Sequence, residues 1–137
     1  MNRRKVLLVG FVAATVLLMA CQSSTSNTNT ADPAGAPKAI ENYLQARVKA
    51  DVNQMIALSC AAWESQAKVE ASTFQSLKAE IEGMTCSVSG SEGSNAFVAC
   101  QGKIKTTYNG ESRERDLAQQ QFKLAHEGGD WRMCGYK

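Results

Sequence analysis

One histidine limits the catalysis that this chain could carry out. His126 is the only histidine among 137 residues, and it stands just before a Glu-Gly-Gly sequence. An imidazole there could act as a general base, but a lone histidine beside a turn is more often a surface side chain. No Ser–His–Asp set, phosphate loop or metal-binding cluster can be built around it. We therefore predict no catalytic residue, no metal and no cofactor.

Cysteines are the other reactive side chains. Beyond Cys21, four remain at separations of 26, 14 and 34 residues: Cys60, Cys86, Cys100 and Cys134. Zinc sites usually contain a close pair such as C-x₂-C, and redox enzymes a C-x-x-C motif, and neither occurs here. In an exported small domain an even set of cysteines indicates disulfides, and four of them allow three connectivities.

The N-terminal residues have the layout of an export signal. Arg3, Arg4 and Lys5 precede an uncharged, mostly apolar run from Val6 to Ala20. A secretory signal has this order: a positively charged region, an apolar region and a small residue before the cleavage site. The sequence Leu18-Met19-Ala20-Cys21 resembles the bacterial lipobox. That resemblance implies that residues 1–20 are a signal peptide. It also implies that Cys21 begins the mature chain and carries acyl chains such as palmitate.

Two alternatives to lipidation are an uncleaved membrane helix and an ordinary secreted protein. The run from Val6 to Ala20 has 15 residues, whereas a spanning helix needs about 20. Acyl chains hold a protein firmly because each buried CH₂ contributes about 0.8 kcal/mol. The resemblance implies a cell-envelope location. Because Gln22 is not acidic, it implies the outer membrane in a Gram-negative species with lipoprotein sorting, and otherwise the outer face of the cell membrane.

The mature chain is one small domain on a tether. Removing residues 1–20 leaves 117 residues with 12 basic and 13 acidic side chains, a net charge of −1. No basic stripe remains, so nucleic acid is not an expected partner. Nine of the 16 residues from Gln22 to Pro37 are Ser, Thr, Asn or Gln, and such a segment cannot bury enough apolar surface to order itself. We predict a lipidated tether over 21–37 and a domain over 38–137.

In the first half of the domain, apolar residues recur three and four positions apart, as on one face of a helix. Ile40, Tyr43 and Leu44 share one face of a helix predicted from Pro37 to Asp51. Two capping boxes, each a capping side chain with Gln three residues later, mark further helix starts at Asp51 and Ser72. Residues 61–70 are compatible with a helix, and the helix that starts at Ser72 is predicted to end at Gly83.

In the second half of the domain, apolar and polar residues alternate with a period of two. This alternation predicts four antiparallel strands, over 86–89, 98–108, 111–126 and 131–136. Asn109-Gly110 is a strong signal for a two-residue hairpin turn. Leu117 and Phe122 are an odd number of residues apart and so would face opposite sides of a regular strand, which predicts a β-bulge near 118–121. A turn at Ser91–Asn95 would bring Cys86 opposite Cys100 on neighbouring strands. Cys60 and Cys134 would then form the second disulfide.

Helices followed by a meander predict an α+β fold in which helices cover one face of a curved sheet. The segments 39–46, 57–60 and 128–134 resemble small bacterial lipoproteins of the nuclear transport factor 2-like superfamily, whose cone-shaped domain packs N-terminal helices into a curved sheet. The resemblance covers about 100 residues from Lys38 to the end. A cystatin-like sheet wrapped on a helix is the alternative.

The resemblance also supplies an enzymatic alternative, since enzymes of the superfamily place Asp, His or Tyr inside the cone. The candidates are Tyr43, Asp51 and His126, although Tyr43 is more often a core residue and Asp51 a helix cap. We instead predict a membrane-anchored, non-catalytic module that binds an envelope protein or a small ligand. An enclosed pocket of about 300 Å³ or more would favour ligand binding or catalysis. A cone filled by aromatic residues would favour a scaffold: Trp63, Phe74, Phe97, Phe122 and Trp131.

Overall fold

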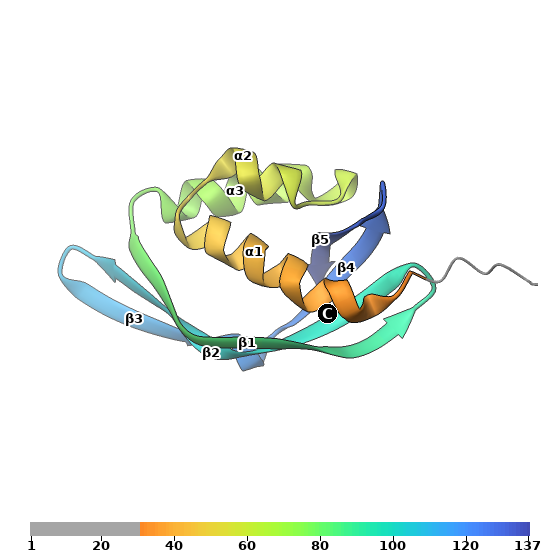
Figure 1. The fold of residues 1–137 in the computed structure, drawn as a ribbon. Coiled ribbons are helices and arrows are strands. Elements are labelled where there is room, and N and C mark those ends of the chain that lie inside the picture. Colours follow the sequence, from red (N-terminus) through yellow and green to blue (C-terminus); the bar gives the residue numbers. More distant parts are fainter. Residues whose placement is uncertain (1–30) are drawn as a thin grey trace, which may run out of the picture.

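Helices lie on one side of a curved antiparallel sheet (Figure 1). The computed structural model describes residues 31–137. The predicted signal peptide, the lipidation at Cys21 and most of the predicted tether lie outside these residues. Within them, no helix is long and apolar enough to cross a membrane.

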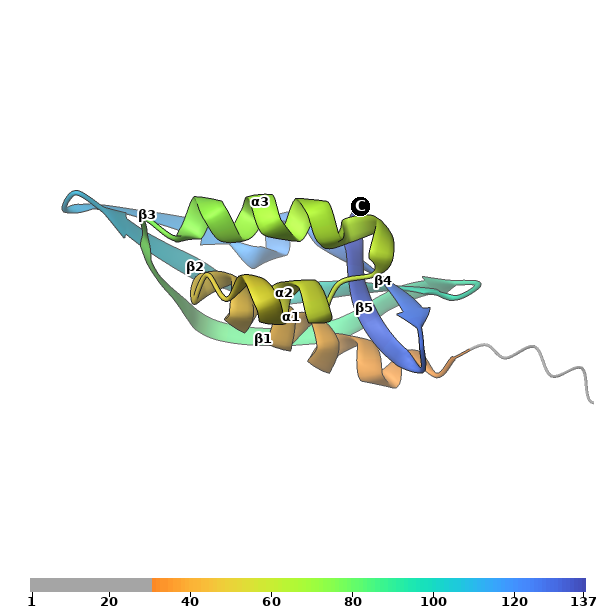
Figure 2. The ribbon, with the colours of Figure 1, turned by 90° about the horizontal axis from the view of Figure 1, so that it is seen from above.

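Five helical segments precede the sheet: η1 (Pro33–Gly35), α1 (Ala36–Val48), α2 (Val52–Ala57), η2 (Ala61–Trp63) and α3 (Glu64–Phe74). The apolar face of α1 is fully buried at Ile40, Tyr43 and Leu44, as its spacing predicts. The predicted cap is confirmed, because the Asp51 carboxylate accepts a 3.0 Å hydrogen bond from the Gln54 N–H. Seen from above, the three α-helices lie over the sheet (Figure 2).

The predicted helix from Ser72 to Gly83 is wrong. Helix α3 continues through Ser72 and ends at Phe74, and strand β1 begins at Lys78. Ile81, which was expected on a helix face, instead pairs with Ile104 of the next strand. The segment 78–82 alternates charged and apolar residues, and its pairing with the adjacent long strand outweighs the local capping signal.

Five strands form the sheet: β1 (Lys78–Glu92), β2 (Asn95–Tyr108), β3 (Glu111–Asp116), β4 (Gln121–Glu127) and β5 (Asp130–Tyr136). The order is β1-β2-β4-β5, and β3 pairs with the other half of β2. The single third strand predicted over 111–126 is therefore two strands. They are separated by the 3-10 turn η3 (Leu117–Gln119) in place of the expected bulge, because β3 and β4 pair with different halves of β2.

Two disulfides tie the fold together. Cys86 and Cys100 are directly paired residues of β1 and β2, and Cys60 is joined to Cys134, 74 residues away on β5. This is the pairing that the predicted hairpin indicates. In the chain-entropy model the short loop contributes about 3 kcal/mol and the long loop about 4 kcal/mol.

The sheet bends at a β-bulge, where Gly83 and Met84 of β1 lie opposite Gly102 of β2. The pairing shifts between Glu82 and Thr85, and Gly102 has φ +101°. A Cβ on Gly102 would lie 2.6 Å from the Glu82 carbonyl oxygen and 2.7 Å from that of Gly83. Only glycine lets the two backbones approach this closely, and the irregularity curves the sheet around α1.

We predict that Gly102→Ala lowers the free energy of unfolding by about 1–3 kcal/mol more than Gly110→Ala does, because its Cβ would overlap the backbone of Glu82 and Gly83. Gly110→Ala is the matched control, because Gly110 also has positive φ but no atom lies within 4 Å of its added Cβ. Chemical denaturation of both variants is the measurement. Equal losses would show that the Cβ contact at Gly102 has no cost of its own.

Candidate functional site

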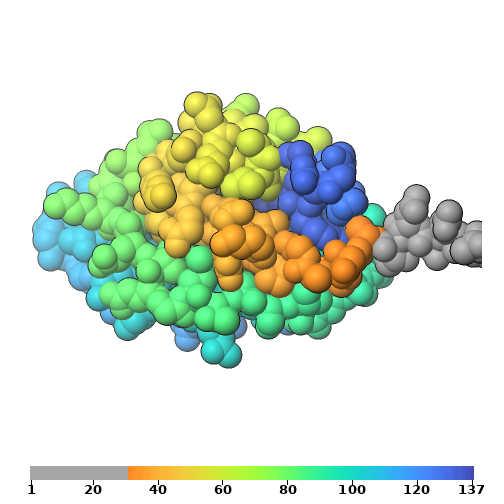
Figure 3. All heavy atoms as spheres, in the orientation of Figure 1, coloured from red at the N-terminus to blue at the C-terminus, as the bar shows by residue number. Residues whose placement is uncertain are grey.

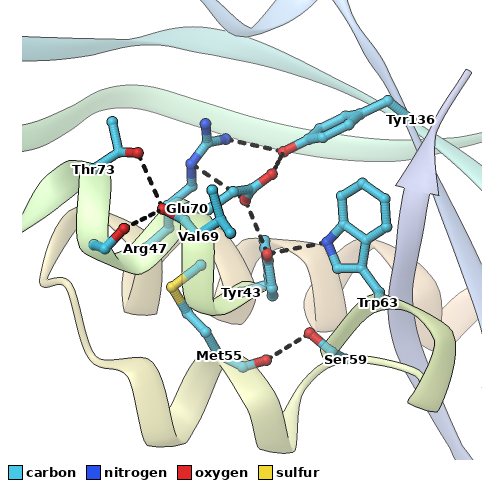
Figure 4. A network of polar contacts seen from close by, with 10 residues as sticks. Tyr43, Arg47, Met55, Ser59, Trp63, Val69, Glu70, Thr73 and Tyr136 are labelled. Carbon is cyan, nitrogen blue, oxygen red and sulfur yellow. Dashed lines mark hydrogen bonds and ion pairs between the residues drawn. The ribbon is translucent and has the colours of Figure 1, made fainter. Parts of the chain in front are cut away.

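A network of five polar side chains occupies the space between the helices and the sheet (Figure 4). It contains Tyr43 and Arg47 of α1, Trp63 of η2, Glu70 of α3 and Tyr136 of β5. Tyr43 and Arg47 are four residues apart, which places them on the same face of α1. Side chains of α1 and β5 therefore meet at one carboxylate of α3, and Trp63 of η2 joins them through Tyr43.

The Glu70 carboxylate accepts a hydrogen bond from each tyrosine. The Tyr43 hydroxyl donates to Oε2 at 2.9 Å, and the Tyr136 hydroxyl donates to Oε1 at 2.7 Å. Each phenol oxygen in turn accepts an N–H: Tyr43 from Trp63 Nε1 at 3.2 Å, and Tyr136 from Arg47 Nη1 at 3.2 Å. Glu70 thus accepts both phenol protons, and neither is free for an outside group.

Glu70 and Arg47 form an ion pair away from water. Their side chains are 8% and 12% exposed, and Arg47 Nε lies 3.6 Å from Glu70 Oε2. That nitrogen makes no hydrogen bond within the described residues. The guanidinium carbon also lies 5.0 Å from the centre of the Phe74 ring, a distance at which a cation is attracted to an aromatic face. Arg47 is therefore held by charge and by packing.

Both tyrosines of the network are held in their neutral form. Burial, with the negative charge of Glu70 added to it, raises the pKa of Tyr43 well above its usual value. Burial also raises the pKa of Tyr136, although the Arg47 charge opposes the shift. A phenol of raised pKa donates a proton in a hydrogen bond but is not a base near neutral pH. Here both donors are already taken by Glu70.

Aromatic residues fill the space around the network. Phe74 is 8% exposed and Phe122 is 1% exposed, and the Trp63 and Tyr136 rings meet edge to face at 5.5 Å. Phe97 does not belong to this set, contrary to our expectation. It lies on the other face of β2, where the Lys137 ammonium sits 4.2 Å from its ring centre, because Ala96 and Val98 take the inward positions of the strand.

The three candidate catalytic residues are not brought together. Tyr43 lies in the network, and its hydroxyl is buried instead of lying at a rim. Asp51 is exposed and caps α2. His126 is half-buried on β4, and its ring is 5.1 Å from that of Trp131, across the strand pair. Within residues 31–137, no group of three or more His, Cys, Asp or Glu side chains could hold a metal ion.

Sequence reasoning missed Arg47, Glu70 and Tyr136. One signal was available for Glu70, which stands between Ala67 and Ala71 on the buried face of α3. A charged residue at an apolar position of a helix requires a partner. The partners come from α1 and β5, and nothing in the sequence pairs those elements.

The surface has several hollows: one of about 660 Å³ lies where Gly83 and Gly102 face each other, and two others are grooves at opposite ends of the domain. The first of these two grooves, which we call the N-terminal groove, has a volume of about 560 Å³ and lies between the start of α1, the end of α2 and the β4–β5 turn. The second, the hairpin groove, has a volume of about 330 Å³ and is lined by residues of the β2–β3 hairpin and by Leu77. Neither groove is lined by a residue of the polar network.

Solved structures share the fold of this domain. A ketosteroid isomerase-like protein from Erwinia carotovora atroseptica matches with a TM-score of 0.53 at 20% identity, over 74% of this chain and 90% of that one. A candidate polyketide cyclase from a Silicibacter species matches with a TM-score of 0.53 at 15% identity, over 75% and 88%. A SEC-C motif protein from Rhodopseudomonas palustris matches with a TM-score of 0.51 at 10% identity, over 80% and 82%.

These likenesses establish the fold, and at such identities they carry no activity to this chain. No family model and no curated protein matches the sequence. The domain is α+β, with helices packed on a curved antiparallel sheet, and has the nuclear transport factor 2-like architecture.

We predict that Glu70→Ala lowers the free energy of unfolding by about 3–5 kcal/mol, because it leaves the buried Arg47 charge without its partner. Glu114→Ala is the control. Its carboxylate pairs with Lys103 at 2.9 Å, but the two side chains are 47% and 43% exposed, so its loss costs at most about 1 kcal/mol. Urea unfolding followed by tryptophan fluorescence compares them, and similar losses would contradict the assigned role of Glu70.

We also predict that Tyr43 and Tyr136 stay protonated as long as the protein is folded. Their pKa values are raised in the folded state and are about 10 in the unfolded chain. The stability that the neutral phenols contribute is therefore complete below about pH 10 and falls as the pH rises further. In a Tyr108→Phe background, tyrosinate absorbance should appear only together with unfolding. Ionisation of either tyrosine in the folded protein would mean that water reaches the network.

Proposed function

We propose that this chain is an exported lipoprotein, held on a membrane surface of the cell envelope through Cys21, whose domain binds a partner or small ligand on its outside. In this proposal residues 1–20 are removed, and residues between Cys21 and η1 connect the lipid to the domain. The interior of the cone carries out no reaction.

The observation that carries the non-catalytic part is the closed hydrogen-bond network around Glu70. Two buried phenol donors could polarise a substrate oxygen, as donors in enzyme sites do. In this domain a carboxylate of the protein already accepts both protons, at 2.9 Å and 2.7 Å. A substrate would have to displace Glu70 and leave a buried charge without its hydrogen bonds, which is costly. An enzymatic role is therefore the weaker alternative.

Two features support export and anchoring. Two disulfides are consistent with an oxidising compartment. The Leu18-Met19-Ala20-Cys21 sequence follows a charged and then an apolar segment. With the other four cysteines paired, Cys21 is the one cysteine of the chain left for acylation.

Binding at the surface suits the remaining architecture. The grooves of about 560 Å³ and 330 Å³ are open hollows of the size of small-ligand sites. The N-terminal groove lies on α1 and β5, two elements that the buried network joins. Such a scaffold can present a binding face without moving.

We predict that Cys21→Ser loses acylation and membrane retention. Metabolic labelling with a palmitate analogue should mark the wild-type chain and not the variant, and fractionation should find less of the variant in membranes. Retention should fall because the apolar run has only 15 residues, against about 20 for a spanning helix. Ser23→Ala is the matched control and should be labelled like the wild type. Equal labelling of Cys21→Ser would refute the anchor.

A further inference from the structure

We propose that the N-terminal groove binds a neutral oligosaccharide. The groove is lined by the N-terminal part of α1, the end of α2 and the β4–β5 turn. These segments meet on the face seen in Figure 3, where the first turns of α1 are orange, α2 is yellow and the β4–β5 turn is blue. The side chains that matter most are Lys38, Asn42, Asp130, Trp131 and Arg132.

One wall of the groove is a tryptophan whose position is set by the backbone. Trp131 Nε1 donates a 2.9 Å hydrogen bond to the Asp32 carbonyl oxygen. Its Cδ1 lies so close to Gly35 that a Cβ there would be 3.2 Å away. The His126 ring meets the indole edge to face at 5.1 Å. These contacts hold a partly exposed indole in one orientation, at little entropic cost to a ligand that stacks on it.

The opposite wall is held by Arg132. Its Nη1 donates to the Ala57 carbonyl oxygen at the end of α2, and its Nε donates to the Glu127 carbonyl oxygen at 3.3 Å. The same guanidinium pairs at 3.5 Å with Asp130, which lies two residues earlier on β5. Arg132 therefore joins α2 to the β4–β5 turn, and the groove keeps its shape without a ligand.

The charges beside the groove favour a neutral ligand. Lys38 pairs with Glu41 at 3.5 Å, and Arg132 pairs with Asp130 at 3.5 Å. Each cation thus has a carboxylate beside it, and the groove carries no cluster of unpaired cations of the kind that holds a phosphate group. The same balance disfavours an anionic lipid surface, which requires an excess of basic residues.

The polar groups that remain suit hydroxyl groups. Asn42 is exposed on α1 and offers an amide donor and an amide acceptor. Asp130 and Lys38 are 75% and 74% exposed, and beside their ion pairs they keep further acceptor and donor sites for hydroxyl groups. A sugar hydroxyl both donates and accepts, and the C–H face of a pyranose ring packs on an indole. A volume of about 560 Å³ lies within the range of small-ligand sites.

This inference rests on the surface-binding role proposed above and names a ligand class for it. It does not depend on the lipid anchor, because the groove is complete within the described residues. Failure of the oligosaccharide test would leave the acylation result and the closed interior as they stand.

The test is an NMR titration of the full chain in detergent micelles with N-acetylchitotetraose and with maltotetraose. We expect at least one of them to shift the Trp131 indole N–H and the Asn42 side-chain amide, with a dissociation constant on the order of 1 mM or tighter. Asn42→Ala should weaken binding by about tenfold or more while the fold is kept, because alanine is the best helix former at this exposed helical position.

Tyr108→Ala is the matched control, since Tyr108 is 55% exposed in the hairpin groove at the other end of the domain. It should leave oligosaccharide affinity unchanged. The proposal is overturned if neither sugar shifts the groove resonances, if Asn42→Ala binds as the wild type does, or if the binding is lost in Tyr108→Ala. It is also overturned if inorganic phosphate or anionic lipid vesicles shift the same resonances and the sugars do not.

Discussion

A single buried carboxylate sets the constraint on which this structure depends. Glu70 can remain charged in the interior only because two phenols, one guanidinium and, through Tyr43, one indole surround it. A buried charge without partners is far more costly than any of these hydrogen bonds is favourable. The positions of α1, η2, α3 and β5 are therefore coupled, because displacing any one of them exposes or orphans a polar atom.

The covalent and backbone features of the fold support that arrangement. Cys60 stands just before η2 and Cys134 two residues before Tyr136, so their disulfide holds the elements of Trp63 and Tyr136 together. The bend at Gly102 curves the sheet around α1. The network, the long disulfide and the bend thus act on the same interior space.

Filling that space has a functional consequence. The domain offers an interior and an exterior, and in the interior Glu70 already accepts the protons of both buried phenols. Recognition would then fall to the surface, where grooves lie at both ends of the domain. The N-terminal groove is lined by α1 and β5, which the network joins. A rigid domain on a lipid anchor would present such grooves at a short distance from the membrane.

Local signals in the sequence determined much of the described domain: the Asp51 cap, the first helix and the hairpin that sets Cys86 against Cys100. Each depends on residues close together in the chain or on a simple period. Tertiary structure alone decided that 78–82 is strand, that 111–126 is two strands, and that Glu70 meets Tyr43 and Tyr136. Those outcomes depend on pairing between distant segments, and neither propensity nor spacing records which distant segment is the partner.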